Sequence, residues 1–340
     1  MIADLLKRWR LVDIGINLTD AMYQGKYQGK RYHTADIADV VRRGSAVGVS
    51  GMLITGSNVK ESELAIKLCE QFNSDEMQCF CSVGCHPTRC SEFVKDPQAY
   101  YDRLDKLITE HSVHHGGCVA AIGEVGLDYD RLFFCPAEIQ LQYFERQLDL
   151  VEKHKLPLFL HDRNTGGDFH KVITRNRSRL HGGVVHSFTG TQEELQQYLE
   201  LGFFIGVNGC SLKTEENLKV VRQIPLDRIL CETDGPWCDV RNTHASRTLL
   251  NSAAGRYETK QCASDTILSR YETCKKEKFR EGCLVKGRCE PCHMVTVIEV
   301  IHELKKEDGK TLEEVAAVIY ENTTKLFPFQ SPHDRKTSEA

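Results

Sequence analysis

One apolar run in the middle of the chain ends in acidic side chains: Val119-Ala120-Ala121-Ile122-Gly123-Glu124-Val125-Gly126-Leu127-Asp128. Its first five residues are continuously apolar, which is typical of a strand that is covered on both faces. A helical pattern follows at 136–154, and the next apolar run occupies 158–161. A strand, a helix and a second strand in this order predict a parallel βαβ unit.

The same unit recurs on both sides of this run. Short apolar runs that predict strands occupy 11–16, 51–55, 78–84, 119–123, 158–161, 183–186, 203–207 and 229–232. Helical patterns occupy 34–46, 60–72, 97–111, 136–154, 168–176, 191–201 and 215–223. Eight such units close into a TIM-type (β/α)8 barrel, whereas an open doubly wound sheet usually has fewer strands. We therefore predict an α/β fold of barrel type, with the open sheet as the alternative.

The alternation stops after the eighth strand. Residues 242–289 are polar, charged and rich in turn residues, which predicts a long insertion at the C-terminal face of the barrel. Helical patterns return at 293–305 and 312–326, and residues 329–340 have the composition of a disordered tail. The expected organisation is a single barrel domain over residues 11–328, followed by this tail.

Composition limits the classes of function. The 340 residues include 44 basic and 48 acidic side chains, for a net charge of −4, which argues against a protein that coats nucleic acid through a broad basic surface. An enzyme with a locally basic groove remains compatible with this balance. No window resembles a membrane span. The odd count of 15 cysteines favours a reducing compartment, cytoplasm or nucleus, with a mitochondrial destination as the alternative.

Potential metal ligands stand at the ends of five of the eight predicted strands. They are His86, Glu124, His161, His186 and Asp234. Any one of them is most often a capping or core residue. In a barrel, however, the carboxyl ends of all strands meet at one mouth, and a polar group there needs a partner. The shared position of the five residues therefore favours one metal site.

Two imidazoles and two carboxylates suit a pair of divalent ions. Glu124 is the natural bridge, with His161 and His186 on one ion and Asp234 on the other. Such a pair orients a phosphate, lowers the pKa of a bound water and stabilises the leaving oxygen. The mixed nitrogen and oxygen set is compatible with Mg²⁺, Mn²⁺ and Zn²⁺.

The longer motifs resemble those of a known family. They are Val12-Asp13-Ile14-Gly15-Ile16-Asn17-Leu18-Thr19, Gly84-Cys85-His86-Pro87, Ile122-Gly123-Glu124-Val125-Gly126-Leu127-Asp128, His161-Asp162-Arg163, Val185-His186-Ser187-Phe188-Thr189-Gly190, Glu232-Thr233-Asp234-Gly235-Pro236-Trp237 and Glu290-Pro291. In this order the chain resembles the TatD family of metal-dependent deoxyribonucleases, within the amidohydrolase superfamily. The similarity covers about residues 11–328 and is greatest to the eukaryotic branch of the family.

The resemblance implies roles for individual residues. Glu124, His161, His186 and Asp234 would be metal ligands, and His86 and Arg163 would contact the substrate phosphate. Family members cleave DNA as 3′→5′ exonucleases and endonucleases and are linked to DNA repair and to DNA fragmentation. DNA is therefore the expected partner, together with other DNA-processing nucleases. From its place near a strand end, Lys213 is a further candidate for phosphate binding.

The chain departs from the wider pattern after its first strand. Many amidohydrolase relatives carry a His-x-His pair there, whereas this sequence reads Gly15-Ile16-Asn17. Two nitrogen ligands are therefore absent from one metal position, which favours exchangeable Mg²⁺ or Mn²⁺ over tightly held Zn²⁺. We expect Asp13 and Asn17 to fill this space.

Three functions follow from these residues. In the first, a metal-bound hydroxide attacks a DNA phosphodiester in line, and Asp234 is both ligand and proton acceptor. In the second, the same centre hydrolyses a carbonyl ester or amide, such as a misacylated tRNA. In the third, the protein binds without catalysis. The first is our primary hypothesis because all four predicted ligands are present.

Other residues suggest secondary roles. Basic side chains in the late insertion could guide a nucleic-acid backbone: Arg241, Arg247, Lys275, Lys276 and Lys278. Trp237 and Tyr271 could stack on bases. Cys283, Cys289, Cys292 and His293 could bind a structural zinc ion, although their spacing lacks the paired arrangement of strong zinc motifs. Cys79, Cys81 and Cys118 fall in apolar runs and are expected to be small buried side chains.

Overall fold

The structure is a computed structural model that describes residues 9–254 and 262–330. One eight-stranded sheet has the order β1-β4-β5-β6-β7-β8-β9-β10, and each neighbouring pair is parallel. The strands are β1 Leu11–Ile16, β4 Val49–Ile54, β5 Gln78–Val83, β6 Val119–Asp128, β7 Leu158–Arg163, β8 Gly183–Val185, β9 Phe204–Val207 and β10 Ile229–Cys231. All eight predicted strands are present, and the largest difference is that β6 continues past Gly123 to Asp128.

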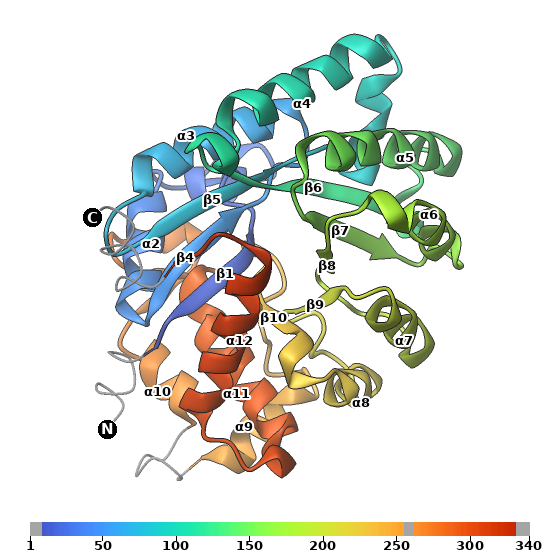
Figure 1. Cartoon of the computed structure of the whole chain (residues 1–340). Coiled ribbons are helices and arrows are strands. Elements are labelled where there is room, and N and C mark those ends of the chain that lie inside the picture. Colours follow the sequence, from blue (N-terminus) through green and yellow to red (C-terminus); the bar gives the residue numbers. More distant parts are fainter. Residues whose placement is uncertain (1–8, 255–261, 331–340) are drawn as a thin grey trace, which may run out of the picture.

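Helices surround the outside of these strands (Figure 1). They are α2 Ile37–Ala46, α3 Val59–Phe72, α4 Pro97–His111, α5 Ala137–His154, α6 Asp168–Asn176, α7 Gln192–Glu200, α8 Glu215–Gln223, α11 Met294–Leu304 and α12 Leu312–Leu326. Their starts follow local capping rules. Thr191 and Glu194 form a capping box at α7, and Asp96 caps α4 ahead of Pro97. The helical patterns of the sequence are therefore confirmed almost residue for residue.

The first and last strands complete the barrel at its mouth. Ile16 forms a parallel bridge with Gly235, and the backbone N–H of Asp234 donates to the carbonyl of Gly15 over 2.8 Å. Asp13 reinforces this closure, because its carboxylate accepts from both the backbone and the hydroxyl of Thr233. Asp13 therefore joins two barrel segments. The expectation that it also occupies the space of a missing metal ligand stays a prediction.

Two apolar layers account for the packing. Inward-facing side chains fill the barrel and include Ile14, Phe159 and Leu230. A larger layer of buried side chains lies between the strands and the helices. Filling the interior in this way makes the barrel a packed core, so chemistry is confined to the loops at the carboxyl ends of the strands.

The late segment is more ordered than a plain loop. Within 242–289, the described part contains two helices, α9 Ser246–Ala253 and α10 Ala263–Leu268, and a pair of two-residue strands, β11 Thr273–Cys274 and β12 Leu284–Val285. A hairpin of β2 Lys26–Tyr27 and β3 Lys30–Arg31 follows β1. These short elements were not predicted, because they bury few apolar residues and therefore show no clear hydrophobic period in the sequence.

The chain after α12 returns beneath the barrel. Phe329 is buried against Phe80, and the backbone of Gln330 bonds to the side chain of Gln78. Residue 329 is therefore packed and does not begin a disordered tail; residues 331–340 of that expected tail lie outside the described residues. Across the described part of the chain, none of the helices combines the length and the apolar character needed to cross a membrane.

Candidate metal centre at the barrel mouth

The extended ladder between β6 and β7 positions the central residues. Alternate residues of a strand share a face, so Glu124, Gly126 and Asp128 are in line along β6. The register pairs Gly126 with His161. A Cβ atom at position 126 would lie 1.8 Å from the carbonyl oxygen of His161, so only glycine allows this approach. His161 consequently lies between the two carboxylates.

Three side chains converge on one oxygen atom. Oε1 of Glu124 lies 2.8 Å from Nδ1 of His161 and 2.7 Å from Nε2 of His186. The two histidine nitrogens are themselves only 3.3 Å apart. All three side chains are largely buried. Such convergence of nitrogen and carboxylate oxygen is the arrangement that a divalent cation requires.

The second nitrogen of each histidine faces a carboxylate. Nε2 of His161 lies 3.2 Å from Oδ2 of Asp128, and Nδ1 of His186 lies 3.5 Å from Oε1 of Glu232. Glu232 is fully buried and also accepts from Asn208. A carboxylate behind a ligating imidazole fixes its orientation and raises its basicity. Neither Asp128 nor Glu232 was among the predicted site residues.

His86 stands beside this group. Its Nε2 atom is 3.4 Å from Oε1 of Glu124, and its ring stacks edge-on against His161 with centroids 4.7 Å apart. Its Nδ1 atom accepts from the backbone N–H of Thr88, so a neutral His86 carries its proton on Nε2. That proton faces Glu124 at the mouth.

The electrostatics match a site built for a cation. Burial alone would raise the pKa of Glu124, but the imidazoles of His186, His86 and His161 outweigh it and hold that pKa well below its usual range. Burial would lower the pKa of His186, but Glu124 and Glu232 outweigh it and raise that pKa well above 6.5. For His86 burial dominates, and its pKa is lowered. Glu124 is thus an anion in contact with three imidazoles, and the pKa is raised for two of them, His161 and His186.

Asp234 approaches from the other side of the mouth. Its backbone adopts a left-handed φ of 48°, and its carboxylate accepts from Nδ2 of Asn17 over 2.9 Å and from the thiol of Cys238 over 3.2 Å. Burial raises its pKa to about 6, an effect that His186 opposes. Asn17 therefore does occupy the position after β1, where it orients Asp234.

Among the described residues, two overlapping groups have the spacing of metal ligands at the mouth. One is Glu124, His161 and His186, and the other is His86, Asp128 and His161, each with ligand atoms within 4.8 Å of one another. The donor set is nitrogen and oxygen, and one Oδ atom of Asp128 is buried without a hydrogen-bond partner. These features fit a divalent ion. Asp234 belongs to neither group, although it interacts electrostatically with His186 and Glu124.

The comparisons with known proteins identify the family. The sequence profile of the family described as TatD related DNase matches residues 12–328. The chain belongs to the TatD family. A deoxyribonuclease Tat-D from Schizosaccharomyces pombe is 42% identical over 326 residues, 94% of this chain and 96% of its own. This match confirms the family. Because the relative is eukaryotic, it also confirms the expected eukaryotic branch.

A solved structure confirms the fold. An uncharacterized amidohydrolase from Saccharomyces cerevisiae superposes with a TM-score of 0.83 at 34% identity, covering 94% of this chain and 100% of its own. A bacterial member, the 3'-5' ssDNA/RNA exonuclease TatD of Pectobacterium carotovorum, is 35% identical over 243 residues, 70% of this chain and 85% of its own. Both a fungal and a bacterial TatD protein therefore match more than two thirds of this chain.

The predicted phosphate contacts lie at the rim of the TatD barrel. Arg163 ends β7, and its Nε donates to Asp130 over 2.8 Å in an exposed pair. Lys213 is exposed after β9. Both act electrostatically on the thiol of Cys210, as does Asp234. The two cations therefore flank the side of the mouth that Asp234 occupies.

Exposed aromatic side chains stand beside the same mouth. Phe133 and Phe134 follow β6 and are 77% and 60% exposed, with ring centroids 4.2 Å apart. Arg131 connects this loop to the site through Asp128, at 3.7 Å. Trp237, three residues after Asp234, is 50% exposed. Trp237 was predicted to stack on bases, but Phe133 and Phe134 were not. Two adjacent aromatic residues directly after a predicted strand were the sequence signal that could have indicated them.

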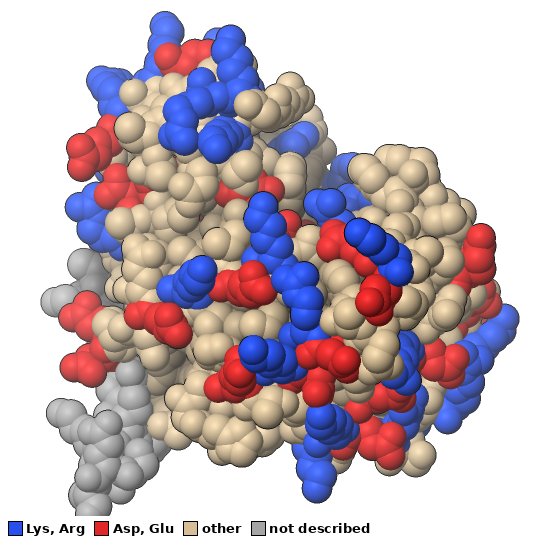
Figure 2. Space-filling view, turned by 90° about the horizontal axis from the view of Figure 1, so that it is seen from above, with Lys and Arg blue, Asp and Glu red and all other residues tan. Residues whose placement is uncertain are grey.

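The expected basic rim of the late segment is only partly available. Arg247 forms a bidentate ion pair with Asp265, and Lys276 lies over the rings of Tyr27 and Tyr32. Tyr271 packs against the apolar core. On a different face of the molecule, seen from above in Figure 2, acidic and basic side chains are intermingled. Two of the five predicted basic residues, Arg247 and Lys276, are thus engaged with other side chains of the described part of the chain.

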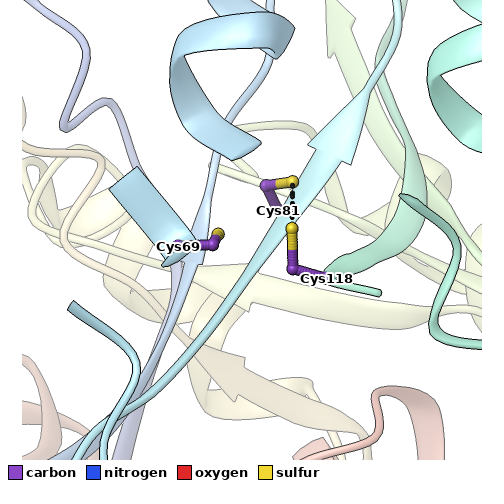
Figure 3. Close-up of side chains that lie close together, drawn as sticks. All are labelled: Cys69, Cys81 and Cys118. Atoms are coloured by element: carbon purple, nitrogen blue, oxygen red, sulfur yellow. Dashed lines mark hydrogen bonds between the residues drawn. The ribbon is translucent and has the colours of Figure 1, made fainter. Parts of the chain in front are cut away.

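Of the cysteines predicted to be buried, Cys79 and Cys81 are buried, whereas Cys118 is half-exposed. Cys283, Cys289, Cys292 and His293 are all described but do not form a cluster with metal-ligand spacing, so the structural zinc alternative is not supported. Cys69, Cys81 and Cys118 do form one, away from the mouth (Figure 3). Hydrogen bonds from the thiols of Cys69 and Cys81 lower the pKa of Cys118 to about 4. The spacing in sequence gave no sign of this cluster.

Proposed function

We propose that this protein is a metal-dependent deoxyribonuclease that hydrolyses DNA phosphodiester bonds at the barrel mouth. The observation that carries the proposal is the convergence of His161 and His186 on Oε1 of Glu124, at 2.8 and 2.7 Å. Relatives named as deoxyribonucleases and exonucleases support it. The function rests on the site, because the barrel fold alone serves many reactions.

The metal ligands in this proposal are Glu124, His161, His186 and Asp234, with Asp128 as an added candidate. Divalent ions bound there would orient the phosphate, activate a water molecule and stabilise the leaving oxygen. We infer two Mg²⁺ or Mn²⁺ ions, because carboxylates contribute as many ligands as imidazoles do and the first strand carries no histidine pair.

The remaining residues bind and orient the substrate. The Nε2 proton of His86 is available to a non-bridging phosphate oxygen, and Arg163 and Lys213 attract neighbouring phosphates. Glu124 and Asp234 are the catalytic carboxylates of this proposal. In this proposal Asp234 would also accept the proton of the attacking water. Phe133, Phe134 and Trp237 offer faces on which unpaired bases stack.

This arrangement favours a strand end as the substrate. Stacked bases and a bound phosphate would position one linkage for cleavage. The name of the bacterial relative, a 3'-5' ssDNA/RNA exonuclease, supports 3′→5′ exonuclease activity, with endonuclease activity as the other form of cleavage proposed. All fifteen cysteines are free thiols, which supports a reducing compartment such as cytoplasm or nucleus. A role in DNA repair or DNA fragmentation, with other nucleases, would follow from this activity.

The test uses chelator-stripped protein and single- and double-stranded DNA labelled at either end. We expect cleavage only after Mg²⁺ or Mn²⁺ is added, and the label pattern reports the polarity. Glu124→Gln should lower the rate by about 10³-fold or more, because it removes the oxygen shared by both histidines. Glu145→Gln, on the outer surface of α5, is the matched control and should retain full activity.

Two results would redirect the proposal. Rapid hydrolysis of a misacylated tRNA or a small ester, with DNA left intact, would assign the same centre to carbonyl chemistry. Failure of the stripped protein to bind any divalent ion in calorimetry would instead leave a binding protein without catalysis.

A further inference from the structure

Three cysteine thiols meet on the outer side of the barrel, between α3 and the strands β5 and β6. Cys69 lies in the last turn of α3, Cys81 in β5 and Cys118 immediately before β6. Their Sγ atoms all lie within 4.8 Å of one another, and those of Cys81 and Cys118 are 3.9 Å apart. Figure 3 shows the three side chains directed toward a common space.

The backbone fixes this arrangement. The N–H of Cys81 donates to the carbonyl of Cys118 over 2.9 Å, so the two residues are neighbours in the sheet. Cys69 belongs to the buried face of α3, next to Ile66 and Ala65. Cys69 and Cys81 are buried, whereas Cys118 is half-exposed. The thiols are therefore held in place with one side open to solvent.

The sulfur spacing matches a thiolate metal site. With metal–sulfur bonds of about 2.3 Å, neighbouring sulfurs in a tetrahedral site are about 3.8 Å apart. The observed 3.9 Å between Cys81 and Cys118 needs almost no adjustment. The three ligand atoms of this group are all sulfur, and soft thiolates select Zn²⁺ and Cu⁺ over Mg²⁺ or Mn²⁺.

We propose that Cys69, Cys81 and Cys118 bind one thiophilic d10 metal ion, Zn²⁺ or Cu⁺. Each metal–sulfur bond that forms releases one thiol proton to solvent, and no electron is transferred. For Zn²⁺, a water molecule reaching the open side of Cys118 supplies the fourth ligand. This site is separate in chemistry from the nitrogen and oxygen centre at the mouth.

The site is also separate in position. Cys118 precedes Glu124 by six residues, about 20 Å of extended chain. A bound ion would connect α3, β5 and the start of β6, and these two strands lead to His86 and Glu124. Its effect is therefore structural: it stabilises the unit that carries the mouth residues, and the thiols themselves contact no substrate.

The experiment uses Co²⁺ as a spectroscopic probe. The full-length protein, reduced, stripped of metal and kept under anaerobic conditions, is titrated with Co²⁺, and the near-ultraviolet thiolate-to-cobalt charge-transfer band is recorded. The ligands proposed at the mouth are imidazole and carboxylate groups, and the variants below separate this band from any contribution of Cys238, whose thiol lies 3.2 Å from Asp234. Subsequent titration with Zn²⁺ or with Cu⁺ shows which ion displaces cobalt at the lower concentration and thus distinguishes the two.

Three variants make the test specific. Two variants remove a proposed ligand: Cys118→Ala at a half-exposed position and Cys69→Ala at a helix end. Each should lose the charge-transfer band and the rise in thermal midpoint that Zn²⁺ or Cu⁺ produces. Cys79→Ala, in the same strand as Cys81 but outside the cluster, should keep both. Circular dichroism confirms that each variant folds, and DNA cleavage should be unchanged in all three.

Two outcomes would overturn the proposal. One is a charge-transfer band that is absent in the parent protein or equally strong in Cys118→Ala and Cys69→Ala. The other is a reduced protein that takes up neither ion at the thiols but forms a Cys81–Cys118 disulfide with peroxide, which would make the cluster a redox pair. Neither outcome affects the nuclease assignment, which depends on the residues at the mouth.

Discussion

At the scale of single residues, the mouth is defined by which atom of each histidine faces which carboxylate. His161 directs Nδ1 to Glu124 and Nε2 to Asp128, and His186 directs Nε2 to Glu124 and Nδ1 to Glu232. Each ring nitrogen of His161 and His186 thus lies within 3.5 Å of a carboxylate oxygen. This arrangement leaves little rotational freedom, which preorganises the site for an ion before it binds.

Replacing Asp128 with Asn tests the carboxylate behind His161. The substitution keeps the size of the side chain but removes its charge, so His161 loses the group that orients it and raises its basicity. We expect metal affinity or activity to fall about 10- to 100-fold. Calorimetric titration with Mn²⁺ measures the first quantity. Unchanged affinity together with unchanged activity would remove Asp128 from the site.

The raised pKa values of His161 and His186 predict two opposite pH dependences. Burial lowers both values, but two effects outweigh it: the hydrogen bonds that His161 donates to Asp128 and Glu124, and the charges of Glu124 and Glu232 near His186. The folded metal-free protein therefore keeps protons that the unfolded chain loses above about pH 6.5. Its stability is fully present below that pH and should fall as the pH rises through the folded pKa values.

Metal affinity should change in the other direction over the same window. An ion must displace the protons on both histidines, so its binding strengthens as the pH rises. Thermal midpoints with EDTA and Mn²⁺ titrations at several pH values above 6.5 measure the two trends. In His186→Asn both slopes should become shallower. A metal-free protein whose midpoint rises over this range would contradict the assignment.

At the scale of elements, strand length decides where chemistry is possible. β6 has ten residues and β7 six, whereas β8 and β10 have three each. The long β6–β7 ladder extends beyond the body of the sheet and carries Asp128 into the mouth. The loop that follows β6 begins at Tyr129 and leads to Phe133 and Phe134, so the same ladder places these rings at the rim.

Replacing Phe133 and Phe134 with Ala tests the loop as a base-stacking platform. Stacking contributes about 1–3 kcal/mol per base, so the KM for single-stranded oligonucleotides should rise about 5- to 100-fold. The kcat for a small phosphodiester without bases should be unchanged. Leu64→Ala, an exposed apolar residue on α3, is the control. Equal losses on both substrates would show damage to the site itself.

At the scale of the whole molecule, buried charges join the end of the late segment to the beginning of the chain. Arg288 is fully buried, donates to Asp36 over 2.8 Å and to Glu290 over 2.8 Å, and Arg43 donates to the same Glu290. The hydroxyl of Tyr23 donates to the carbonyl of Cys289 over 2.7 Å. The late segment therefore supports the closing side of the barrel near Asp234.

Replacing Arg288 with Ala should destabilise the protein strongly. It leaves the carboxylates of Asp36 and Glu290 buried with less compensation, which costs about 3–5 kcal/mol. Urea unfolding measures the loss, and metal affinity of the folded fraction should be retained. Arg175→Ala removes an exposed pair with Glu145 and should change stability little. Equal losses of unfolding free energy in both variants would mean that the buried network stabilises the protein no more than an exposed ion pair does.

The sequence by itself determined the order and type of the elements, the barrel, the family and the positions of Glu124, His161, His186 and Asp234. These features are local: apolar period, capping residues such as Thr191, and ligand-type side chains at strand ends can all be read within a few residues. Helix bounds were predicted best because caps and periodicity define them. Motif order then identified the family.

Only the tertiary structure decided which residues meet. Asp128 joins the site because pairing with β7 extends β6 past Glu124, and that pairing depends on register. Asp13 closes the barrel against Thr233, 220 residues away. Cys69, Cys81 and Cys118 converge because helix α3 packs on β5. The physical reason is common to all three: a local pattern shows that a side chain is buried, but its partner is set by strand register and packing between distant segments.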